Sequence, residues 1–387
     1  MRHRRRRRQR RRLRPARAEP TGEAARAVRI LFALPGFHRV DRGAEVALLA
    51  VASACAQAGD AVTVMGSGRP RPGTPYRFVH VPSVPRERFE RAPTFPVMRG
   101  DTVWEEATFA PPLAARFRPH EFDVTVTCSF PFTNWVLRRP VLRGRRPAHV
   151  FVTQNGDWPT ITDTSEYRWF GCDGLVCTNP DYYERNRARW PSALIPNGTD
   201  VTRFTPGPAE RARFGLPEDV PVVLMVSALI HTKRVEDGIR AVAPYPKAHL
   251  VVAGDGPLRE PVDALAAELL PGRFSRVSVA PADMPALYRS ADVFLHMSKL
   301  EAFGNVFVEA MACGLPVVGH DTPRLRWIVG DDEPLVDSED VSAVGAALQG
   351  ALQMPAEAVA ARVARAQRFG WDRIGEEYRA FFRSIVA

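Results

Sequence analysis

Short apolar runs alternate with helix-forming stretches along most of this chain, and this alternation constrains the fold more than any other feature. An apolar run at residues 28–35 is followed by an alanine-rich stretch at 44–58 and by a second apolar run at 61–65. Strand, helix and strand in this order predict a βαβ unit, the opening of a doubly wound α/β sheet. Residues 66–120 are rich in proline and arginine, and we expect loops and short elements there.

A second series of the same kind follows a turn-rich segment at residues 194–206. A chain of 387 residues is long for one hydrophobic core, so two domains are expected. We predict Rossmann-like domains at 28–195 and 196–368, and a final helix at 369–387 that packs back on the N-terminal domain. Ligands would bind in the cleft between the carboxyl ends of the two sets of strands.

The positive charge of the chain is concentrated at its N-terminus. Residues 1–18 contain eleven arginines and no acidic residue, so subtracting them from the net charge of +10 leaves residues 19–387 at about −1. Like charges without apolar residues predict a disordered Arg-rich tail, which we assign to residues 1–27. The tail could touch RNA or anionic lipid, or have no function if translation starts near Val28. The near-neutral body makes nucleic acid an unlikely main partner.

Cysteine usage and hydropathy favour a cytoplasmic protein. The five cysteines are odd in number and lie mostly in apolar runs, which indicates reduced and buried thiols. No apolar run approaches the roughly 20 residues needed to span a bilayer. A basic stretch could make peripheral contact with the inner face of a membrane, or could simply be solvated; it consists of Arg138, Arg139, Arg143, Arg145 and Arg146.

The segment at residues 298–316 combines the features of an anion-binding site. An apolar strand is expected to end near His296, and the loop after it carries Glu301. Gly304 then opens a helix that contains Glu309. Glycine lets the backbone approach a ligand, and the free N–H groups at a helix start favour phosphate. Two carboxylates on either side of such a helix start suit a molecule with hydroxyl groups on both sides of a diphosphate.

The stretch from Glu301 to Glu309 resembles the E-x7-E signature of the retaining GT-B glycosyltransferases, glycosyltransferase family 4 or "glycosyl transferases group 1". Other short segments of this chain are similar to segments of the family and occur in the same order, so the resemblance extends from about Val28 to the C-terminus. It implies that Glu309 holds the ribose hydroxyls of a nucleotide-sugar donor and that Glu301 contacts the transferred sugar as a catalytic residue. It also implies that four consecutive residues offer backbone N–H groups to the sugar and diphosphate: Phe303, Gly304, Asn305 and Val306.

The same resemblance implies phosphate-binding residues elsewhere in the chain. Lys233 matches a family lysine that neutralises the leaving diphosphate, and we expect it to act in catalysis. The position of the family's arginine is Ala228 here, so we expect the neighbouring Arg234 to supply the second charge to the donor. Gly43, in the loop before the first helix, is expected to contact the donor phosphates or the acceptor. The alternatives are solvated cations at a helix start and a loop glycine without a ligand.

The loop at residues 153–159 departs most from the family pattern. Many relatives carry a histidine here, whereas this chain has Gln154, Asn155 and Asp157 beside Trp158. We expect Gln154 and Asn155 to face the donor sugar or the acceptor, and Asp157 to be able to accept the proton of the acceptor hydroxyl. A turn-capping role for Asn155 and Asp157 is the alternative.

The resemblance therefore implies a retaining hexosyltransferase that uses a UDP- or GDP-sugar. Its acceptor would be a glycan, a lipid-linked sugar or a small molecule, in the synthesis of cell-surface glycans, glycolipids or secondary-metabolite glycosides. The chain contains no Asp-x-Asp triplet, so neither a metal nor another cofactor is expected. One alternative is another nucleotide-sugar enzyme of this architecture, such as an epimerase. A second is a non-catalytic protein that holds nucleic acid with its Arg-rich tail.

Overall fold

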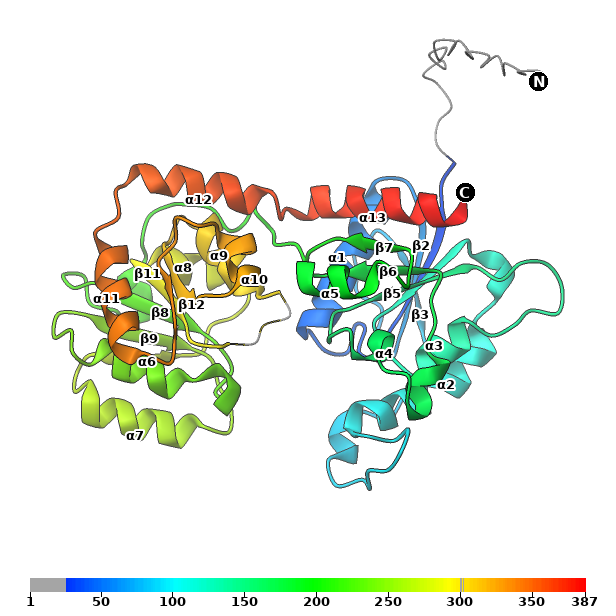
Figure 1. Ribbon diagram of the computed structural model, residues 1–387, viewed down its shortest axis with the longest axis horizontal. Coiled ribbons are helices and arrows are strands. Elements are labelled where there is room, and N and C mark those ends of the chain that lie inside the picture. The colour runs from blue at the N-terminus through cyan, green and yellow to red at the C-terminus, as the bar shows by residue number, and fades with distance from the viewer. Residues whose placement is uncertain (1–25, 300, 302) are drawn as a thin grey trace, which may run out of the picture.

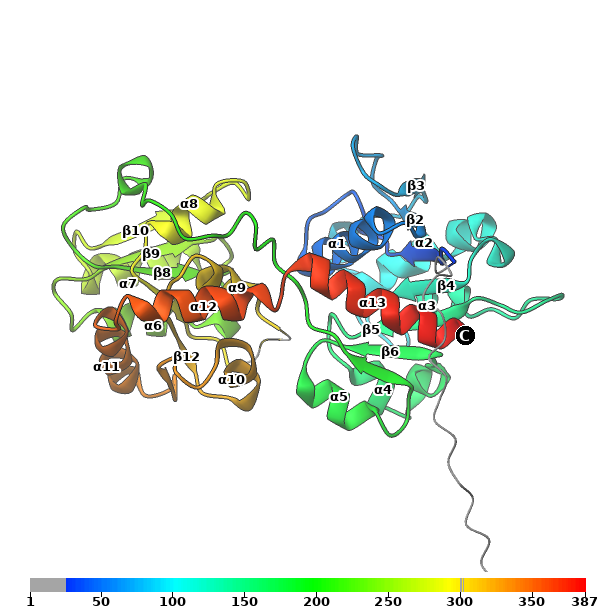
Figure 2. The ribbon, with the colours of Figure 1, turned by 90° about the horizontal axis from the view of Figure 1, so that it is seen from above.

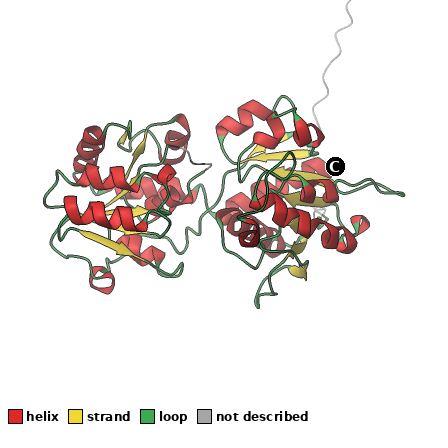
Figure 3. Ribbon diagram, turned by 90° about the horizontal axis from the view of Figure 1, so that it is seen from below, coloured by secondary structure: helices red, strands yellow, loops and turns green. Residues whose placement is uncertain are grey.

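The computed structural model describes residues 26–299, 301 and 303–387, in which the chain folds into two α/β domains that lie side by side (Figure 1). Each domain contains a parallel sheet with helices on both faces (Figure 3). The predicted class, two doubly wound Rossmann-like domains, is therefore confirmed. The predicted Arg-rich tail at residues 1–27 lies almost entirely outside the described residues.

Both sheets are built from parallel strands with buried apolar residues, as sheets covered on two faces require. The strands of the N-terminal sheet are β1 (Arg29–Ala33), β2 (Ala61–Gly66), β3 (Arg77–His80), β4 (Val124–Thr127), β5 (Ala148–Val152), β6 (Gly174–Cys177) and β7 (Ser192–Leu194). Those of the C-terminal sheet are β8 (Val222–Val226), β9 (His249–Ala253), β10 (Phe274–Val277), β11 (Val293–His296), β12 (Val317–His320) and β13 (Leu335–Val336).

The strand order of the two sheets is the same in kind. The N-terminal sheet has the order β3-β2-β1-β4-β5-β6-β7, and the C-terminal sheet has the order β10-β9-β8-β11-β12-β13. In each sheet the direction of winding reverses once, between β1 and β4 and between β8 and β11. Doubly wound sheets bind ligands outside the carboxyl ends of the strands at such a point, so each domain contributes one wall of a potential site.

The helices connect successive strands and cover the sheets. In the N-terminal half they are α1 (Gly43–Gln57), α2 (Asp101–Arg116), α3 (Phe132–Leu137), α4 (Trp158–Ile161) and α5 (Pro180–Asn186). The later helices are α6 (Val235–Val242), α7 (Arg259–Leu269), α8 (Met284–Arg289), α9 (Asn305–Ala312), α10 (Pro323–Val329), α11 (Val341–Leu352), α12 (Glu357–Gln367) and α13 (Trp371–Val386). None of the helices in the described residues is long and apolar enough to cross a membrane.

Residues 66–120 contain more regular structure than the sequence predicts. β3 pairs with β2, and α2 is a helix of 16 residues with Pro111 and Pro112 inside it. Proline removes a backbone donor and usually interrupts a helix, which is why the pattern of this segment suggested loops. Packing outweighs that cost, because Phe109 and Leu113 on one face of α2 are fully buried.

The end of the chain returns from the C-terminal domain to the N-terminal domain. α12 lies on the C-terminal domain, and α13 continues from it across the N-terminal domain (Figures 1 and 2). Where the chain crosses, the N–H of Thr199 donates to the carbonyl of Phe369 at 2.8 Å. Gly198 lies so close to the ring of Trp371 that a Cβ would approach it to 2.5 Å. The outgoing and returning segments therefore cross between the domains in direct contact.

The final helix completes the core of the N-terminal domain. Ile374, Tyr378 and Phe382 recur every four residues, and all three are at most 1% exposed. They pack in one cluster with residues of β1 and α1, and the rings of Phe32 and Phe382 meet edge to face at 6.4 Å. An amphipathic helix at the very end of the chain thus fills a groove beside the first strand.

An ion pair in the middle of α13 gives a test of this docking. Arg379 donates to Asp60, whose side chain is 1% exposed, at 2.6 Å. Arg379→Ala leaves that buried carboxylate without its cation, and we expect it to destabilise the N-terminal domain by about 2–3 kcal/mol. Differential scanning calorimetry should show the transition of that domain lowered by about 5–10 °C.

The matched control is Arg373→Ala on the same helix. Arg373 pairs with Glu377 at 3.3 Å on the surface, where the two side chains are 58% and 36% exposed. Its loss should cost less than about 0.5 kcal/mol. Equal shifts in the two variants would contradict the docking role of Arg379.

A buried carboxyl on α2 should make the stability depend on pH. Burial raises the pKa of Glu106 from 4.5 to about 7, against the opposing effect of the Thr133 N–H that it accepts. Between these values the folded chain keeps a proton that the unfolded chain has lost, so this contribution to stability falls as the pH rises through 7. Glu106→Gln cannot titrate, so its stability relative to the wild type should rise by about 3 kcal/mol from pH 4 to pH 9.

This change is measured by thermal unfolding across the pH range. Glu121→Gln is the control, because Glu121 is an exposed carboxyl that follows α2 in the chain. The control should track the wild type at every pH. If Glu106→Gln also tracked the wild type, Glu106 would not be a buried carboxyl with a raised pKa.

Candidate functional site

A cavity of about 960 Å³ lies between the two domains, at the carboxyl ends of their strands. In the C-terminal domain it is lined by the last residues of three strands, Val226, Ala253 and His296. In the N-terminal domain it is lined by residues that follow β1, β4 and β5, among them Leu34 and Cys128. The cavity therefore occupies the place that the strand order of both sheets favours for a ligand.

Glu301 is the charged centre of the C-terminal wall. It accepts hydrogen bonds from Lys233 and from Nε2 of His296, the latter at 2.9 Å. Burial by itself would raise the pKa of Glu301, but the hydrogen bonds and charges of His296 and Lys233 outweigh it and lower the pKa to about 2. The carboxylate is therefore ionised throughout the physiological range. Strand β11 supplies the histidine and the loop after β8 supplies the lysine.

The start of α9 lies beside this carboxylate. Gly304 has φ of +86°, a conformation that side chains other than glycine rarely adopt, and a Cβ would meet the ring of Phe307 at 2.6 Å. The ring of Phe303 is 2% exposed and packs against Phe369, so its backbone rather than its side chain is available to a ligand. Together with Asn305 and Val306, these residues line the cavity. The first turn of a helix leaves N–H groups unbonded, which favours an anion.

Glu309 lies one turn further along α9 and is not among the residues that line the cavity. Its carboxylate accepts a hydrogen bond from the hydroxyl of Tyr288 at 2.8 Å. Burial raises the pKa of Glu309, while Tyr288 and the charge of Arg203 act in the opposite direction. The structure thus places the second glutamate of the motif behind the helix start, on the side of α8.

Lys233 and Arg234 are neighbours in sequence but point to different surroundings. Lys233 ends a short 3-10 helix, His231–Lys233, and reaches the cavity. Arg234 has a left-handed backbone, with φ of +53°, and its guanidinium donates to Asp237 at 2.8 Å and to Ser338 at 2.9 and 3.0 Å. These contacts hold Arg234 away from the cavity, and the predicted second phosphate ligand is instead tied to the loop before α11.

The N-terminal wall is formed by the start of α1, by buried carboxyl groups and by two arginines, Arg42 and Arg86. A Cβ built at Gly43 would meet no protein atom within 4 Å, so protein packing does not require glycine at this cavity-lining position. Glu45 also lines the cavity, and burial raises its pKa. Glu106 lies on the same wall, with its pKa raised to about 7. This wall therefore combines carboxyl groups of raised pKa with two cations, opposite the charged pair of the C-terminal wall.

The loop after β5 contributes to the cavity through two of its three predicted residues. Gln154 and Asn155 both line the cavity, and Asn155 is exposed. The side-chain amide of Gln154 forms two hydrogen bonds with that of Asn197, at 2.6 and 3.0 Å. Because both amides are used in this pair, Gln154 joins the loop to the segment that leads into the second domain.

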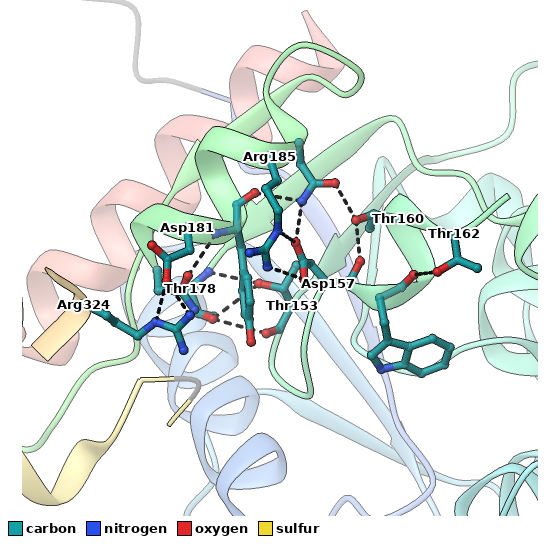
Figure 4. Close-up of polar contacts among 12 residues, drawn as sticks. Thr153, Asp157, Thr160, Thr162, Thr178, Asp181, Arg185 and Arg324 are labelled. Atoms are coloured by element: carbon teal, nitrogen blue, oxygen red, sulfur yellow. Dashed lines mark hydrogen bonds and ion pairs between the residues drawn. The ribbon is translucent and has the colours of Figure 1, made fainter. Parts of the chain in front are cut away.

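Asp157 does not face the cavity, contrary to the prediction that it could accept a proton there. Its carboxylate receives Arg185 at 2.8 and 3.0 Å and Asn186 at 2.9 Å, and the residue is 4% exposed (Figure 4). It is absent from the cavity lining, and its backbone carbonyl accepts the N–H of Thr160 at 2.9 Å. The side chain does not cap the turn before α4 either, because it accepts no backbone N–H there. The residues of α5 hold it instead.

The basic stretch at residues 138–146 is largely used inside the N-terminal domain. Arg138 donates to the carbonyl of Trp169, and Arg139 donates to two carbonyls at the end of α2. Arg146 forms two hydrogen bonds with Asp173, at 2.5 and 2.8 Å. Three of the five arginines thus have internal partners, which leaves less charge for a membrane surface than the sequence suggests.

Among the cavity-lining side chains that sequence reasoning missed are His296 and Glu106. His296 ends an apolar strand, and a polar residue at the carboxyl end of a strand in a doubly wound sheet is the signal that could have identified it. Glu106 gave no comparable signal, because its helix was not predicted. In the described part of the chain, no group of three or more histidine, cysteine or acidic residues is arranged to hold a metal ion.

Two family models match consecutive parts of the chain. The model described as "Glycosyltransferase Family 4" matches residues 42–203, and the model described as "Glycosyl transferases group 1" matches residues 208–368. The change from one model to the other falls in the segment that joins the two sheets. The two matches together account for nearly all of both domains.

Curated relatives match part of the chain. A D-inositol 3-phosphate glycosyltransferase from Acidothermus cellulolyticus is 35% identical over 50% of this chain and 48% of its own length. A lipopolysaccharide core biosynthesis glycosyltransferase from Rhizobium meliloti is 30% identical over 56% of this chain and 63% of its own. A GDP-mannose-dependent mannosyltransferase from Mycolicibacterium smegmatis is 34% identical over 51% and 58%. The chain thus spans about half the length of the curated relatives it matches.

Solved structures match nearly the whole chain. Sucrose-phosphate synthase from Thermosynechococcus elongatus matches with a TM-score of 0.72 and 22% identity. The match covers 92% of this chain and 98% of the synthase chain. The Anabaena protein HepE, in complex with UDP and glucose, has a TM-score of 0.69 at 18% identity and covers 92% and 100%. These likenesses show a shared fold. The two family models, which together match most of the chain, show that it belongs to glycosyltransferase family 4, the group 1 glycosyl transferases, and its fold is GT-B.

Proposed function

We propose that this protein transfers a sugar from a nucleotide-sugar donor to an acceptor, with retention of the anomeric configuration. The observation that carries the proposal is the charged centre at the carboxyl ends of β8 and β11. There the ionised Glu301 is held by Lys233 and His296 beside the start of α9. A cation, a helix start and a fixed carboxylate are the elements needed to bind a diphosphate and the sugar attached to it.

The donor would bind mainly to the C-terminal domain. Its diphosphate would lie at the start of α9, where free N–H groups and the helix dipole favour negative charge, with Lys233 opposite. Its ribose hydroxyls would bind Glu309, whose carboxylate is oriented by Tyr288. We propose a UDP- or GDP-sugar. UDP-glucose is the first donor to test, because solved neighbours of the same fold hold UDP and glucose or UDP-glucose.

The reaction would proceed on one face of the sugar. The bond between the anomeric carbon and the phosphate oxygen breaks, and the acceptor oxygen forms a bond to the same face of that carbon. The acceptor proton passes to an oxygen of the departing phosphate. Lys233 and the N–H groups of α9 stabilise the negative charge that develops on the leaving group. Glu301 would orient the sugar hydroxyls, since its carboxylate is already bound by two donors.

The acceptor would bind against the N-terminal wall. Gly43 leaves room beside the start of α1, and Asn155 offers an exposed amide on the opposite loop. Glu45 and Glu106 provide carboxyl groups that can form hydrogen bonds with hydroxyls, and burial raises the pKa of both. This chemistry suits a polyhydroxylated acceptor, which is consistent with the inositol phosphate, phosphatidylinositol mannoside and lipopolysaccharide core in the names of relatives. An acceptor of these kinds could be free or lipid-linked.

The proposal is tested by incubating the protein with UDP-, GDP- and ADP-sugars and with panels of inositol phosphates and oligosaccharides. The expected result is acceptor-dependent release of nucleoside diphosphate, with a product whose anomeric configuration, read by NMR, matches that of the donor. Conversion of the donor sugar without an acceptor would indicate an epimerase instead. Absence of turnover and of binding with every donor would refute the proposal.

Lys233→Ala should slow the chemical step more than it weakens donor binding. The lysine stabilises charge that grows as the leaving group departs, so kcat should fall about 10²- to 10³-fold while the KM for the donor changes less. Steady-state kinetics with varied donor measures both. Lys247→Ala, at an exposed position before β9, is the matched control and should retain wild-type constants.

Glu309→Ala should weaken nucleotide binding. Loss of a charged acceptor for two ribose hydroxyls should raise the dissociation constant for the nucleoside diphosphate about 10- to 100-fold, as measured by isothermal titration calorimetry. Glu268→Ala, on the exposed face of α7, should bind like the wild type. Nucleotide binding by Glu309→Ala at wild-type strength would remove the ribose contact from the proposal.

A further inference from the structure

Arg324 on α10 joins the two domains at the loop that carries Glu301. Its Nε and Nη2 donate to one carboxylate oxygen of Asp181 on α5 of the N-terminal domain, at 3.0 and 2.5 Å (Figure 4). Its third donor, Nη1, bonds to the backbone carbonyl of Glu301. One planar guanidinium therefore spans the domain boundary and the charged centre of the site.

Both helix starts are capped in ways that fix the partners. Thr322 accepts the N–H of Leu325 at 3.1 Å, and Pro323 occupies the first turn of α10, so Arg324 follows a rigid start. On the other side, Asn179 accepts the N–H of Tyr182 at 3.0 Å and caps α5. The ion pair thus forms between residues in the first turns of two capped helices.

The contact continues into the N-terminal domain through an aromatic ring. The guanidinium of Arg324 lies 5.3 Å from the ring centroid of Tyr182, and that of Arg185 lies 5.2 Å from the same centroid. Arg185 is in turn bound to Asp157, at the end of the loop that begins with Gln154 (Figure 4). Asp157 therefore orders the surface against which Arg324 packs.

We propose that Arg324 is a positioning residue, which fixes the backbone of Glu301 when the N-terminal domain supplies Asp181. This inference rests on the proposed function of Glu301. The carboxylate of Glu301 is held from the C-terminal domain by Lys233 and His296, whereas its backbone is held by a group that is itself bound to the other domain. Closure of the two domains thereby sets the orientation of the sugar-binding carboxylate.

The geometry requires an arginine. Three N–H donors in one plane bind two partners, the carboxylate of Asp181 and the carbonyl of Glu301. The single ammonium group of a lysine could not reach both. Part of the guanidinium is shielded, since the Arg324 side chain is 20% exposed and that of Asp181 is 42% exposed. Salt should therefore weaken the pair without abolishing it.

The test compares variants on the two sides of the contact. Asp181→Asn removes the interdomain charge but leaves Arg324 free to hold Glu301, and should lower kcat about 10-fold. Arg324→Gln removes both contacts and should lower it about 100-fold. Arg324→Lys should fall between them, and Asp181→Glu, which keeps the carboxylate, should retain most of the activity.

Two matched controls share the chemistry of these changes. Arg326→Gln alters an arginine of the same helix that pairs with Asp321 of its own domain at 2.6 Å. Asp163→Asn alters an exposed acid that pairs with Arg189 within the N-terminal domain at 2.7 Å. Neither pair reaches the other domain, so both variants should retain the wild-type kcat.

Binding and scattering measurements separate positioning from general damage. The nucleoside diphosphate should bind all variants within about twofold of the wild type, because its proposed contacts lie in the C-terminal domain. Small-angle X-ray scattering should show a larger radius of gyration for unliganded Asp181→Asn and Arg324→Gln than for the wild type and the controls. A loss of nucleotide binding parallel to the loss of kcat would mean that the fold is damaged and would overturn the inference.

Failure of this inference can be told apart from failure of the proposed function. If the wild type transfers sugar and both variants keep the wild-type kcat, Arg324 does not position Glu301 and only this inference falls. If the wild type turns over no donor, the proposed function fails and the positioning role falls with it. Scattering profiles that do not differ between the wild type and the variants would contradict the interdomain role of the ion pair in either case.

Discussion

The negative charge of Glu301 is the element around which the site is arranged. A carboxylate taken out of water is costly unless it is paired, and here two partners keep it ionised. These partners come from segments far apart in the chain, Lys233 after β8 and His296 at the end of β11. They meet because β8 and β11 are neighbours at the point where the winding of the sheet reverses. The strand order is therefore what makes a partly buried charge tolerable at this position.

The two walls of the cavity differ in their electrostatics. The C-terminal wall combines Lys233 with a helix start, and both favour a phosphate group. The N-terminal wall offers Glu45 and Glu106, for which burial makes the neutral form more accessible. The N-terminal wall also carries Arg42 and Arg86. Under the proposed function, the diphosphate binds at the helix start of one wall and the hydroxyl-rich acceptor binds against the carboxyl groups of the other. Under that proposal the two domains have separate tasks, although their sheets are wound in the same way.

The fold could be predicted from the sequence because it rests on local signals. Alternating apolar and helical segments indicate two doubly wound domains. The helix α2 was not predicted because it contains two prolines, which usually interrupt a helix. Motif residues next to a glycine and a helix start, such as Gly304 and Asn305, also lie at the cavity. The directions of Arg234 and Asp157 could not be predicted in this way. Arg234 points toward Ser338, and Asp157 points toward Arg185. Each partner is distant in the sequence from the residue that it binds.

The docking of α13 has a consequence for the order in which the protein is made. Ile374, Tyr378 and Phe382 fill the core beside β1, so the N-terminal domain lacks part of its interior until residue 386 has left the ribosome. The C-terminal domain, synthesised later, can bury its own sheet before then. The domain that begins first is therefore the last to be completed. Until then its groove beside β1 is an apolar surface that a chaperone could shield.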